Sequence, residues 1–165
     1  MNDDRSSEMP VFLESEDHRI LSVLQHRGRI TNTELADEVA MSTSPCWRRV
    51  RRLEDEGVIR GYRAVVDRKR VGFGVMAFMN VQLDRHSEAE QLRFQEEVTK
   101  IPQVVGCYVI AGNSDFLLQV VARDLEDYSS FAITKIGRLP GIRAMNTSFV
   151  LKELTSPGVL PLDEL

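Results

Sequence analysis

Residues 42–57 constrain the fold more strongly than any other stretch, because they contain the start, the body and the end of one short helix. Ser42 is a residue type favoured at the N-cap, where its hydroxyl accepts a hydrogen bond from a free backbone amide. Pro45 is tolerated only in the first turn, and Gly57 suits the left-handed position just past the last turn. The stretch therefore predicts a helix that begins after Ser42 and ends before Gly57.

The predicted helix has one apolar side and one cationic side. Cys46, Val50 and Leu53 are spaced by four and three residues, which brings them together on one side of a helix. The arginines are predicted to point away from that side, and they are Arg48, Arg49, Arg51 and Arg52. A run of this kind is often only a solvated helix face, so the residues before it decide its meaning.

A second short helix directly precedes the arginine-rich one. Thr31 and Glu34 have the spacing of a capping box, and Leu35 and Val39 supply an apolar side. Two short helices joined by a turn of about three or four residues are typical of a helix-turn-helix. In that motif the second helix enters the major groove of DNA with its N-terminal residues at the base edges. Residues 42–44 are short and polar at that end, so the pattern predicts binding to double-stranded DNA.

The DNA-binding domain is predicted to be a winged helix-turn-helix over residues 14–66. A first helix is expected from Ser15, as its N-cap, to about Arg27, and residues 58–66 are β-prone with a turn at Gly61. Wing arginines would lie beside DNA phosphates. The predicted DNA-binding residues are Thr33, Ser42, Thr43, Ser44, Pro45, Trp47, Arg48, Arg49, Arg51, Arg52, Arg60 and Arg63.

Charge and cysteine content exclude several other classes of protein. The net charge of the 165 residues is −4, so this is not a basic nucleic-acid coat, although residues 41–53 carry a local charge of +4. Cys46 and Cys107 lack CxxC partners, which argues against a zinc site or a disulfide framework. Residues 1–10 do not resemble a signal peptide, and the apolar runs are too short to span a membrane. A cytoplasmic protein without metal, cofactor or membrane association is expected.

The second half of the chain is predicted to be a ferredoxin-like sandwich, which makes the whole an α+β protein. Strand, helix, strand, strand, helix and strand follow in the order of the split βαβ fold. Their predicted ranges are 74–83, 88–100, 104–111, 116–122, 124–139 and 142–154. The predicted division is a flexible lead-in at 1–13, the DNA-binding domain at 14–66, a hinge at 67–73, and an effector-binding and oligomerisation domain at 74–165.

The first predicted strand is apolar on both sides. One side is predicted to carry Val75, Ala77, Met79 and Val81, and the other Met76, Phe78 and Leu83. Helices on one face leave the opposite face of such a sheet bare, so a second copy of the chain is expected to cover it. The alternative is a sheet that tolerates exposed apolar surface.

Several motifs together resemble the leucine-responsive regulatory protein/AsnC family, also called feast/famine regulators. The resemblance covers about residues 14–162. Its most specific pieces are GRITN at 28–32, SPC at 44–46 running into RVRRLE at 49–54, GVI at 57–59, GNSDFLL at 112–118, LPG at 139–141 and SFVLK at 148–152. The resemblance implies a bacterial or archaeal transcription regulator whose C-terminal RAM domains pair into dimers, which often assemble into octamers.

The resemblance also implies an amino-acid effector, bound between dimers near residues 112–115. Many members have an acid directly after the glycine of this turn, whereas this chain has Asn113, so the identity of the effector stays open. Backbone amides of the turn would hold the carboxylate, and Asp115 would pair with the ammonium group. Because Asn113 cannot supply a second negative charge, a neutral amino acid with a mostly apolar side chain is expected rather than a basic one. The predicted effector-binding residues are Tyr108, Gly112, Asn113, Ser114, Asp115 and Thr134.

Two other functions compete with an effector-responsive regulator. A nucleoid-architectural protein of the same build would bind DNA without any effector. An enzyme would need a reactive constellation, but His18, His26 and His86 accompany neither a nucleophile nor a metal-ligand pattern. Asp115 could likewise be only a turn residue with no ligand. The sequence therefore predicts a regulator and no catalytic residues.

Overall fold

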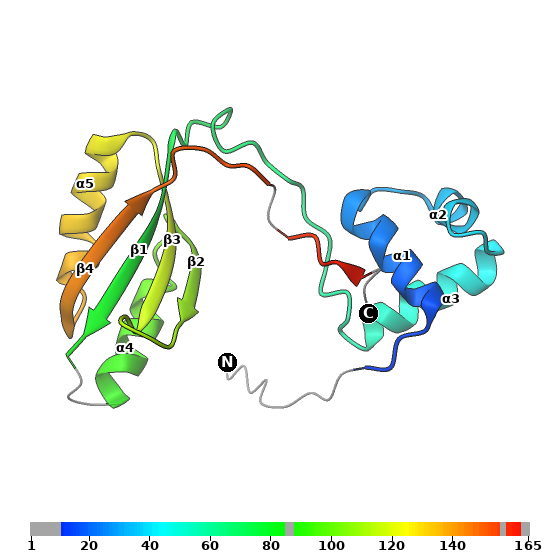
Figure 1. Cartoon of the computed structure of the whole chain (residues 1–165), viewed down its shortest axis with the longest axis horizontal. Helices are drawn as coiled ribbons and strands as arrows, with labels where there is room; N and C mark the ends of the chain where they lie inside the picture. The colour runs from blue at the N-terminus through cyan, green and yellow to red at the C-terminus, as the bar shows by residue number, and fades with distance from the viewer. Residues whose placement is uncertain (1–10, 85–87, 156–157, 163–165) are drawn as a thin grey trace. The chain divides into compact units, whose positions relative to one another are not determined.

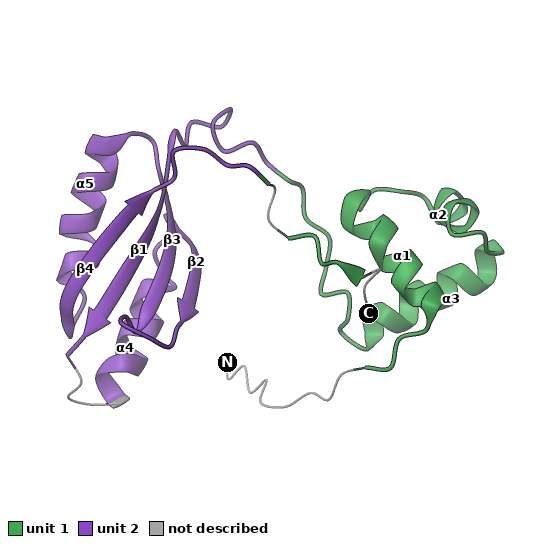
Figure 2. Ribbon diagram, in the orientation of Figure 1, with its two compact units in different colours: residues 1–65, 155–165 green, residues 66–154 purple. Residues whose placement is uncertain are grey.

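The computed structural model describes residues 11–84, 88–155 and 158–162. The chain forms two compact units (Figure 2). One unit comprises the residues up to Val65 together with the segment from Thr155 onward, and the other comprises Val66–Leu154. The C-terminal segment, expected to end the second domain, therefore groups with the DNA-binding half. No described helix is long and apolar enough to cross a membrane.

The first unit contains three helices around one small core (Figure 1). They are α1 Ser15–His26, α2 Asn32–Glu38 and α3 Thr43–Asp55. Ile20, Leu35 and Leu53, one from each helix, are almost completely buried in that core. The apolar side predicted for α3 is the side that packs, because Cys46 and Val50 are also buried there. Ser44, Trp47, Arg48 and Arg51 on other sides of α3 are exposed.

Local hydrogen bonds fix where these helices begin and end. Thr31 and Glu34 form the expected capping box at α2, whereas α1 is capped by Glu14 rather than by Ser15. The Glu14 backbone amide donates to the Asp17 carboxylate at 2.9 Å, so Asp17 supplies the second half of a capping box. Past the end of α3, Gly57 adopts the left-handed conformation at φ 72°.

The segment after α3 is extended but unpaired. Residues 58–66 form no strand, although they are β-prone, because two short strands alone are only marginally stable in water. Tyr62 instead donates a hydrogen bond to Glu54 of α3 at 3.0 Å. Desolvation by burial, followed by this contact with Glu54, raises the pKa of Tyr62 to about 12. Tyr62, which was expected to lie in the wing, therefore links residues 58–66 to α3.

The C-terminal segment returns to α1. The Gln25 side chain donates to the Leu160 carbonyl at 3.2 Å and accepts from the Leu160 amide at 2.7 Å. Leu162 is half-buried and packs against the core of the first unit. No periodic pattern in the sequence marks this return, because it depends on two backbone groups of Leu160 and on the side chains of Gln25 and Leu162.

Removing the chain from Thr155 onward is expected to destabilise the first unit by about 1–2 kcal/mol, through the loss of two hydrogen bonds and the burial of Leu162. Urea unfolding followed by the fluorescence of Trp47, the single tryptophan, measures that unit. Leu160→Ala is the control, because both bonds of Leu160 come from its backbone. Equal unfolding midpoints for the truncated and full-length chains would contradict the expectation.

The second unit is a four-stranded antiparallel sheet in the order β2-β3-β1-β4, which confirms the predicted ferredoxin-like topology. Helices α4 and α5 both lie behind the sheet in Figure 1. The elements are β1 Val75–Leu83, α4 Glu88–Val98, β2 Val104–Val109, β3 Phe116–Ala122, α5 Leu125–Thr134, the 3₁₀ turn η1 Ile136–Arg138 and β4 Ile142–Phe149. Asp124 caps α5 as its sequence position suggests.

The two faces of β1 differ in burial. Ala77, Met79 and Val81 are fully buried under the helices, and Leu83 lies with them at 3% exposure. The assignment of Leu83 to the opposite face is therefore wrong, because odd-numbered positions of one strand share a face. Met76 and Phe78 are half-buried on the face that no helix covers. That face is the surface on which a second copy was expected.

β4 ends at Phe149, earlier than the predicted Leu154, because the antiparallel strand β1 with which it pairs begins at Val75. Phe149 pairs with Ala77, and the Val150 amide donates to the Met76 carbonyl at 2.9 Å, after which β1 offers no further partner. The following residues instead meet the predicted hinge, where Arg68 pairs with Glu153 at 3.2 Å. Arg68 also donates to two backbone carbonyls of residues 73–74, so the hinge carries ordered turns.

Candidate nucleic-acid interface and effector pocket

The first turns of α3 present short polar side chains to solvent. Ser42, Thr43 and Ser44 are all exposed at the N-terminal end of the helix. Ser42 occupies the N-cap position, but its hydroxyl makes no capping bond, so it remains available to another partner. One turn further on, the Arg51 guanidinium lies 5.3 Å from the centre of the Trp47 ring, and both side chains are exposed. A cation–π contact at this distance is attractive and holds the two side chains side by side on the exposed surface of the helix.

The four arginines of α3 divide into two pairs. Arg48 and Arg51 are exposed, whereas Arg49 and Arg52 turn toward α1 and bond to Asp17. All four point away from the apolar side as predicted, but only Arg48 and Arg51 are exposed. The division follows from helix geometry, because residues three apart share a face. The predicted contacts Thr33, Arg60 and Arg63 are also exposed, while Pro45 is half-buried.

Asp17 is the residue that sequence reasoning missed. Its carboxylate is fully buried and accepts from Arg49 at 3.0 Å, from Arg52 at 2.5 Å and from the Glu14 amide. Desolvation by burial raises the pKa of Asp17, but these hydrogen bonds together outweigh it and leave the pKa below its ordinary value. A signal was present, because Asp17 lies on the same helical stripe as Ile20 and Leu24.

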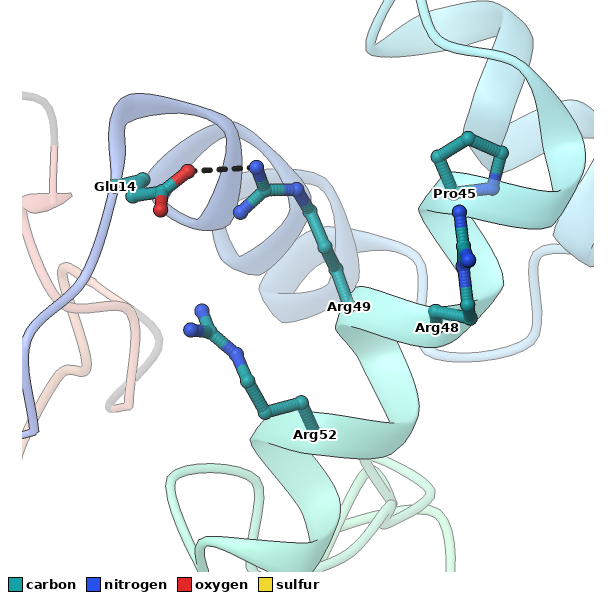
Figure 3. A pocket seen from close by; sticks show the side chains of 5 residues that line it. All are labelled: Glu14, Pro45, Arg48, Arg49 and Arg52. Carbon is teal, nitrogen blue, oxygen red and sulfur yellow. Dashed lines mark hydrogen bonds and ion pairs between the residues drawn. The ribbon is translucent and has the colours of Figure 1, made fainter.

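A hollow opens between the start of α1 and α3. Its volume is about 370 Å³, and its lining residues are Glu14, Pro45, Arg48, Arg49 and Arg52. In Figure 3 Arg49 and Arg52 extend toward α1, while Arg48 lies beside Pro45. Arg49 bonds to the Glu14 carboxylate at 2.6 Å. Three guanidinium groups around one opening, with Glu14 as the acid among the lining residues, make its lining cationic.

Residues 112–115, the turn expected to bind an effector, connect β2 to β3. Gly112 adopts φ 134°, a conformation that favours glycine. One oxygen of the Asp115 carboxylate accepts from the Leu83 amide at 2.8 Å, and the Asp115 amide donates to the Val81 carbonyl at 3.0 Å. Asp115 therefore has a structural task in holding the turn against β1, and its second carboxylate oxygen remains for another partner.

A small polar hollow lies beside this turn. Its volume is about 80 Å³, and it is lined by Gln82, Leu83, Gly112, Asn113, Asp115 and Arg143. Arg143 donates to the Gln82 side chain at 2.9 Å, and Gln82 in turn donates to the Asn113 carbonyl. The hollow thus contains a carboxylate and a guanidinium, the two charges that complement a free amino acid.

Three of the predicted effector residues line this hollow, namely Gly112, Asn113 and Asp115. Tyr108, Ser114 and Thr134 lie outside the lining set. Tyr108 folds back along its strand, so that its hydroxyl would lie 3.1 Å from a Cβ atom at Gly106. The Thr134 hydroxyl bonds to the Ser130 carbonyl of its own helix at 2.7 Å.

Gln82 and Arg143 were missed because the prediction followed the turn and ignored the neighbouring strand. Gln82 pairs with Ala144 in the β1–β4 ladder, which brings Arg143 to the same sheet end. Among the described residues, no group of three or more His, Cys, Asp or Glu side chains could hold a metal ion. His86 lies outside the described residues.

The chain matches two family models. Residues 17–60 match a winged helix-turn-helix DNA-binding domain, and residues 76–160 match the Lrp/AsnC ligand binding domain. The leucine-responsive regulatory protein of Rhizobium meliloti is 39% identical over 144 residues, covering 87% of this chain and 92% of that protein. The DNA-binding transcriptional activator DecR of Escherichia coli K12 is 32% identical over 152 residues, covering 92% of this chain and 100% of that protein.

A solved structure is similar over nearly the whole chain. The transcriptional regulator NMB0573 of Neisseria meningitidis, in complex with L-methionine, is 38% identical, with a TM-score of 0.89. The alignment covers 93% of this chain and 99% of that one. These relatives carry the names of transcription regulators and not of enzymes.

Proposed function

The chain belongs to the Lrp/AsnC family of transcription regulators, and from that premise we propose how it binds DNA, which effector it takes and how it assembles. It is a sequence-specific DNA-binding regulator whose DNA binding or assembly responds to a small amino acid. The observation that carries the DNA-binding proposal is the exposed side of α3, with short polar residues at its N-terminal end and two exposed arginines one to two turns further on.

Within that surface, residues 42–44 read base edges, and Arg48 and Arg51 contact phosphates. Base contacts carry sequence information, whereas phosphate contacts fix position and affinity. Thr33, Trp47, Arg60 and Arg63 flank the same helix and supply further contacts to the DNA backbone. Arg49 and Arg52 act from the hollow beside Pro45.

Thr43→Ala is expected to change the preference between related operator sequences by roughly 5- to 100-fold, because one lost base contact is worth about 1–3 kcal/mol. Affinity for random DNA should change little, since no phosphate contact is removed. Competition binding with an in vitro selected operator and a random duplex measures both. Equal losses on the two duplexes would contradict base reading by this residue.

The effector is an amino acid with a neutral, mostly apolar side chain, such as methionine. The Neisseria relative, solved with L-methionine, supports this choice. Arg143 would bind the carboxylate and the second oxygen of Asp115 the ammonium group. The hollow of about 80 Å³ is smaller than the roughly 300 Å³ of complete ligand pockets, so a second dimer would supply the remaining wall.

Methionine at about a hundred times its dissociation constant is expected to stabilise the protein by about 2.7 kcal/mol, which a thermal-shift screen of the twenty amino acids detects. Arg143→Gln should weaken binding by roughly 10- to 100-fold, because it removes a charge-assisted contact. Asp115→Asn keeps the acceptor for the Leu83 amide but loses the charge opposite the ammonium group. Arg138→Gln is the control, as an exposed arginine outside the hollow.

Unchanged affinity in Arg143→Gln and Asp115→Asn would contradict this effector site. If no amino acid stabilises the protein or changes its affinity for DNA, an effector-independent architectural protein becomes the better description. Calorimetry of the best ligand, with sedimentation alongside, separates binding from a change in assembly. A coupling of about 1–3 kcal/mol is expected between effector and assembly.

The regulator forms homodimers through the uncovered sheet face, and dimers assemble toward octamers. Apolar side chains on two strands support this, since Met76, Phe78 and Leu117 share that face through the register of β1 and β3 and are only half-buried. A paired sheet would bury them as the helices bury the opposite face. Its site of action is the bacterial cytoplasm, where the DNA that it binds is found.

A further inference from the structure

The hollow beside the recognition helix α3 contains more positive charge than its own acids balance. Three arginines of α3 line it, and Glu14 is the one acid in the lining. The buried Asp17 and Glu56 oppose Arg52 from outside the lining. One donor is also left over, because the Arg52 Nε atom is buried without a hydrogen-bond partner among the described residues. The Glu56 carboxylate lies 4.0 Å from that atom, which is too far for a hydrogen bond. Three guanidinium groups against one carboxylate in the lining favour an anion in the opening.

The two acids are held very differently. Asp17 is fully buried and accepts three hydrogen bonds, so removing it from its arginines would leave buried charge without compensation. The Glu14 side chain is 47% exposed and bonds to one guanidinium nitrogen of Arg49. Solvent-exposed ion pairs of this kind contribute about 0–1 kcal/mol. Glu14 can therefore give way to a competing anion, whereas Asp17 stays in place.

A phosphodiester group could take the place of the Glu14 carboxylate on Arg49. The Arg49 guanidinium presents a planar fork of donors, which suits carboxylate and phosphate oxygens alike. Asp17 holds one guanidinium nitrogen of Arg49 and one of Arg52, so both groups stay oriented after Glu14 leaves. The hollow also borders Pro45 and Arg48, in the first turns of the helix that reads DNA. A backbone phosphate next to the bound major groove would reach it.

We propose that this hollow binds one phosphate of the DNA backbone, and that Glu14 occupies the place of that phosphate while DNA is absent. The inference rests on the proposed DNA binding by α3 and assigns a regulatory task to an acid outside the helix-turn-helix. When DNA arrives, Arg49 exchanges the Glu14 carboxylate for a phosphate oxygen. Glu14 thereby lowers affinity for all DNA and limits binding to random sequence.

Counterion release gives this exchange a measurable signature. A phosphate that meets a free arginine releases a cation, which contributes about 0.9 to the log–log dependence of affinity on salt. A Glu14 carboxylate that is set free takes up a cation from solution and cancels that contribution. Glu14→Gln removes the uptake, so its salt dependence should be steeper than that of the wild type by up to about 0.9 per DNA-binding head.

The experiment compares full-length wild type and Glu14→Gln on a random-sequence duplex by fluorescence anisotropy over a series of KCl concentrations. Glutamine keeps an oxygen for the capping bond of α1, and a thermal melt checks that the variant folds. We expect affinity at low salt to rise by roughly 3- to 10-fold, together with the steeper slope. Arg49→Ala in the Glu14→Gln background should abolish both gains.

Glu38→Gln is the matched control, because Glu38 also neutralises one exposed arginine, Arg27, within the same unit but outside the hollow. It changes net charge by the same amount and should leave the slope unaltered. An unchanged slope in Glu14→Gln, or an equal change in Glu38→Gln, would overturn the inference while leaving DNA binding intact. A wild-type protein that binds no DNA would instead overturn the proposed function itself.

Discussion

Replacing Asp17 by alanine is expected to destabilise the DNA-binding unit by about 2–4 kcal/mol, somewhat less than the roughly 3–5 kcal/mol for removing one partner of a fully buried ion pair. Two guanidinium groups lose the carboxylate that orients them, and the capping box of α1 loses its second half. The cost falls below the upper limit because Arg49 and Arg52, at 26% and 38% side-chain exposure, can turn toward water.

Trp47 fluorescence during urea unfolding measures this loss, since the single tryptophan lies on α3. Glu14→Gln is the matched control, because it neutralises an exposed acid on the same arginine and should cost less than about 1 kcal/mol. A loss below about 1 kcal/mol in Asp17→Ala would mean that the apolar core alone seats α3.

The same carboxylate predicts how stability depends on pH. The pKa of Asp17 is below its ordinary value of 3.8 in the folded chain, despite burial, because Glu14, Arg49 and Arg52 donate to it. Its contribution is therefore fully present above pH 3.8 and is lost as the pH falls toward the lowered value. The difference in unfolding free energy between wild type and Asp17→Asn should shrink on acidification through that window.

The elements of this fold could be predicted because their signals are local. The capping box at Thr31 and the cap at Asp124 each depend on residues within one turn. The alternation along β1 likewise identifies its buried face, although Leu83 was assigned against that alternation. These features need no knowledge of distant parts of the chain, and the structure has them where the sequence implied them.

The features that escaped prediction all depend on contacts between distant residues. Asp17 meets α3 across 32 and 35 positions of sequence, and Leu160 meets Gln25 across 135. Arg143 reaches the effector turn only through the register of β4 on β1. The arginine run by itself predicts one cationic surface. In the fold, Asp17 of α1 binds Arg49 and Arg52 and leaves Arg48 and Arg51 exposed. Which arginines are exposed therefore depends on how α1 packs against α3.

The second large effect concerns the sheet face that no helix covers. Phe78 lies near the middle of β1 on that face and is half-buried in the single chain. Phe78→Glu is expected to split the proposed dimer, because a two-fold interface would bury the two carboxylates near each other without partners. Sedimentation measures the shift from dimer to monomer. Leu125→Glu is the control, an equal change at an exposed site in the first turn of α5.

Loss of the dimer should carry over to DNA, since two linked heads bind two half-sites far more tightly than one. The effective concentration of the second head is worth a factor of about 10² to 10⁴ in affinity. Half-sites for such a dimer lie about 10 base pairs, or a multiple, apart on one side of the helix. Inserting about half a turn between them should therefore cost the wild type most of that factor. The Phe78→Glu variant should already lack this gain in affinity, so the insertion should not change its affinity for DNA further. A wild type that tolerates the insertion, or a monomeric variant that still detects it, would contradict paired heads.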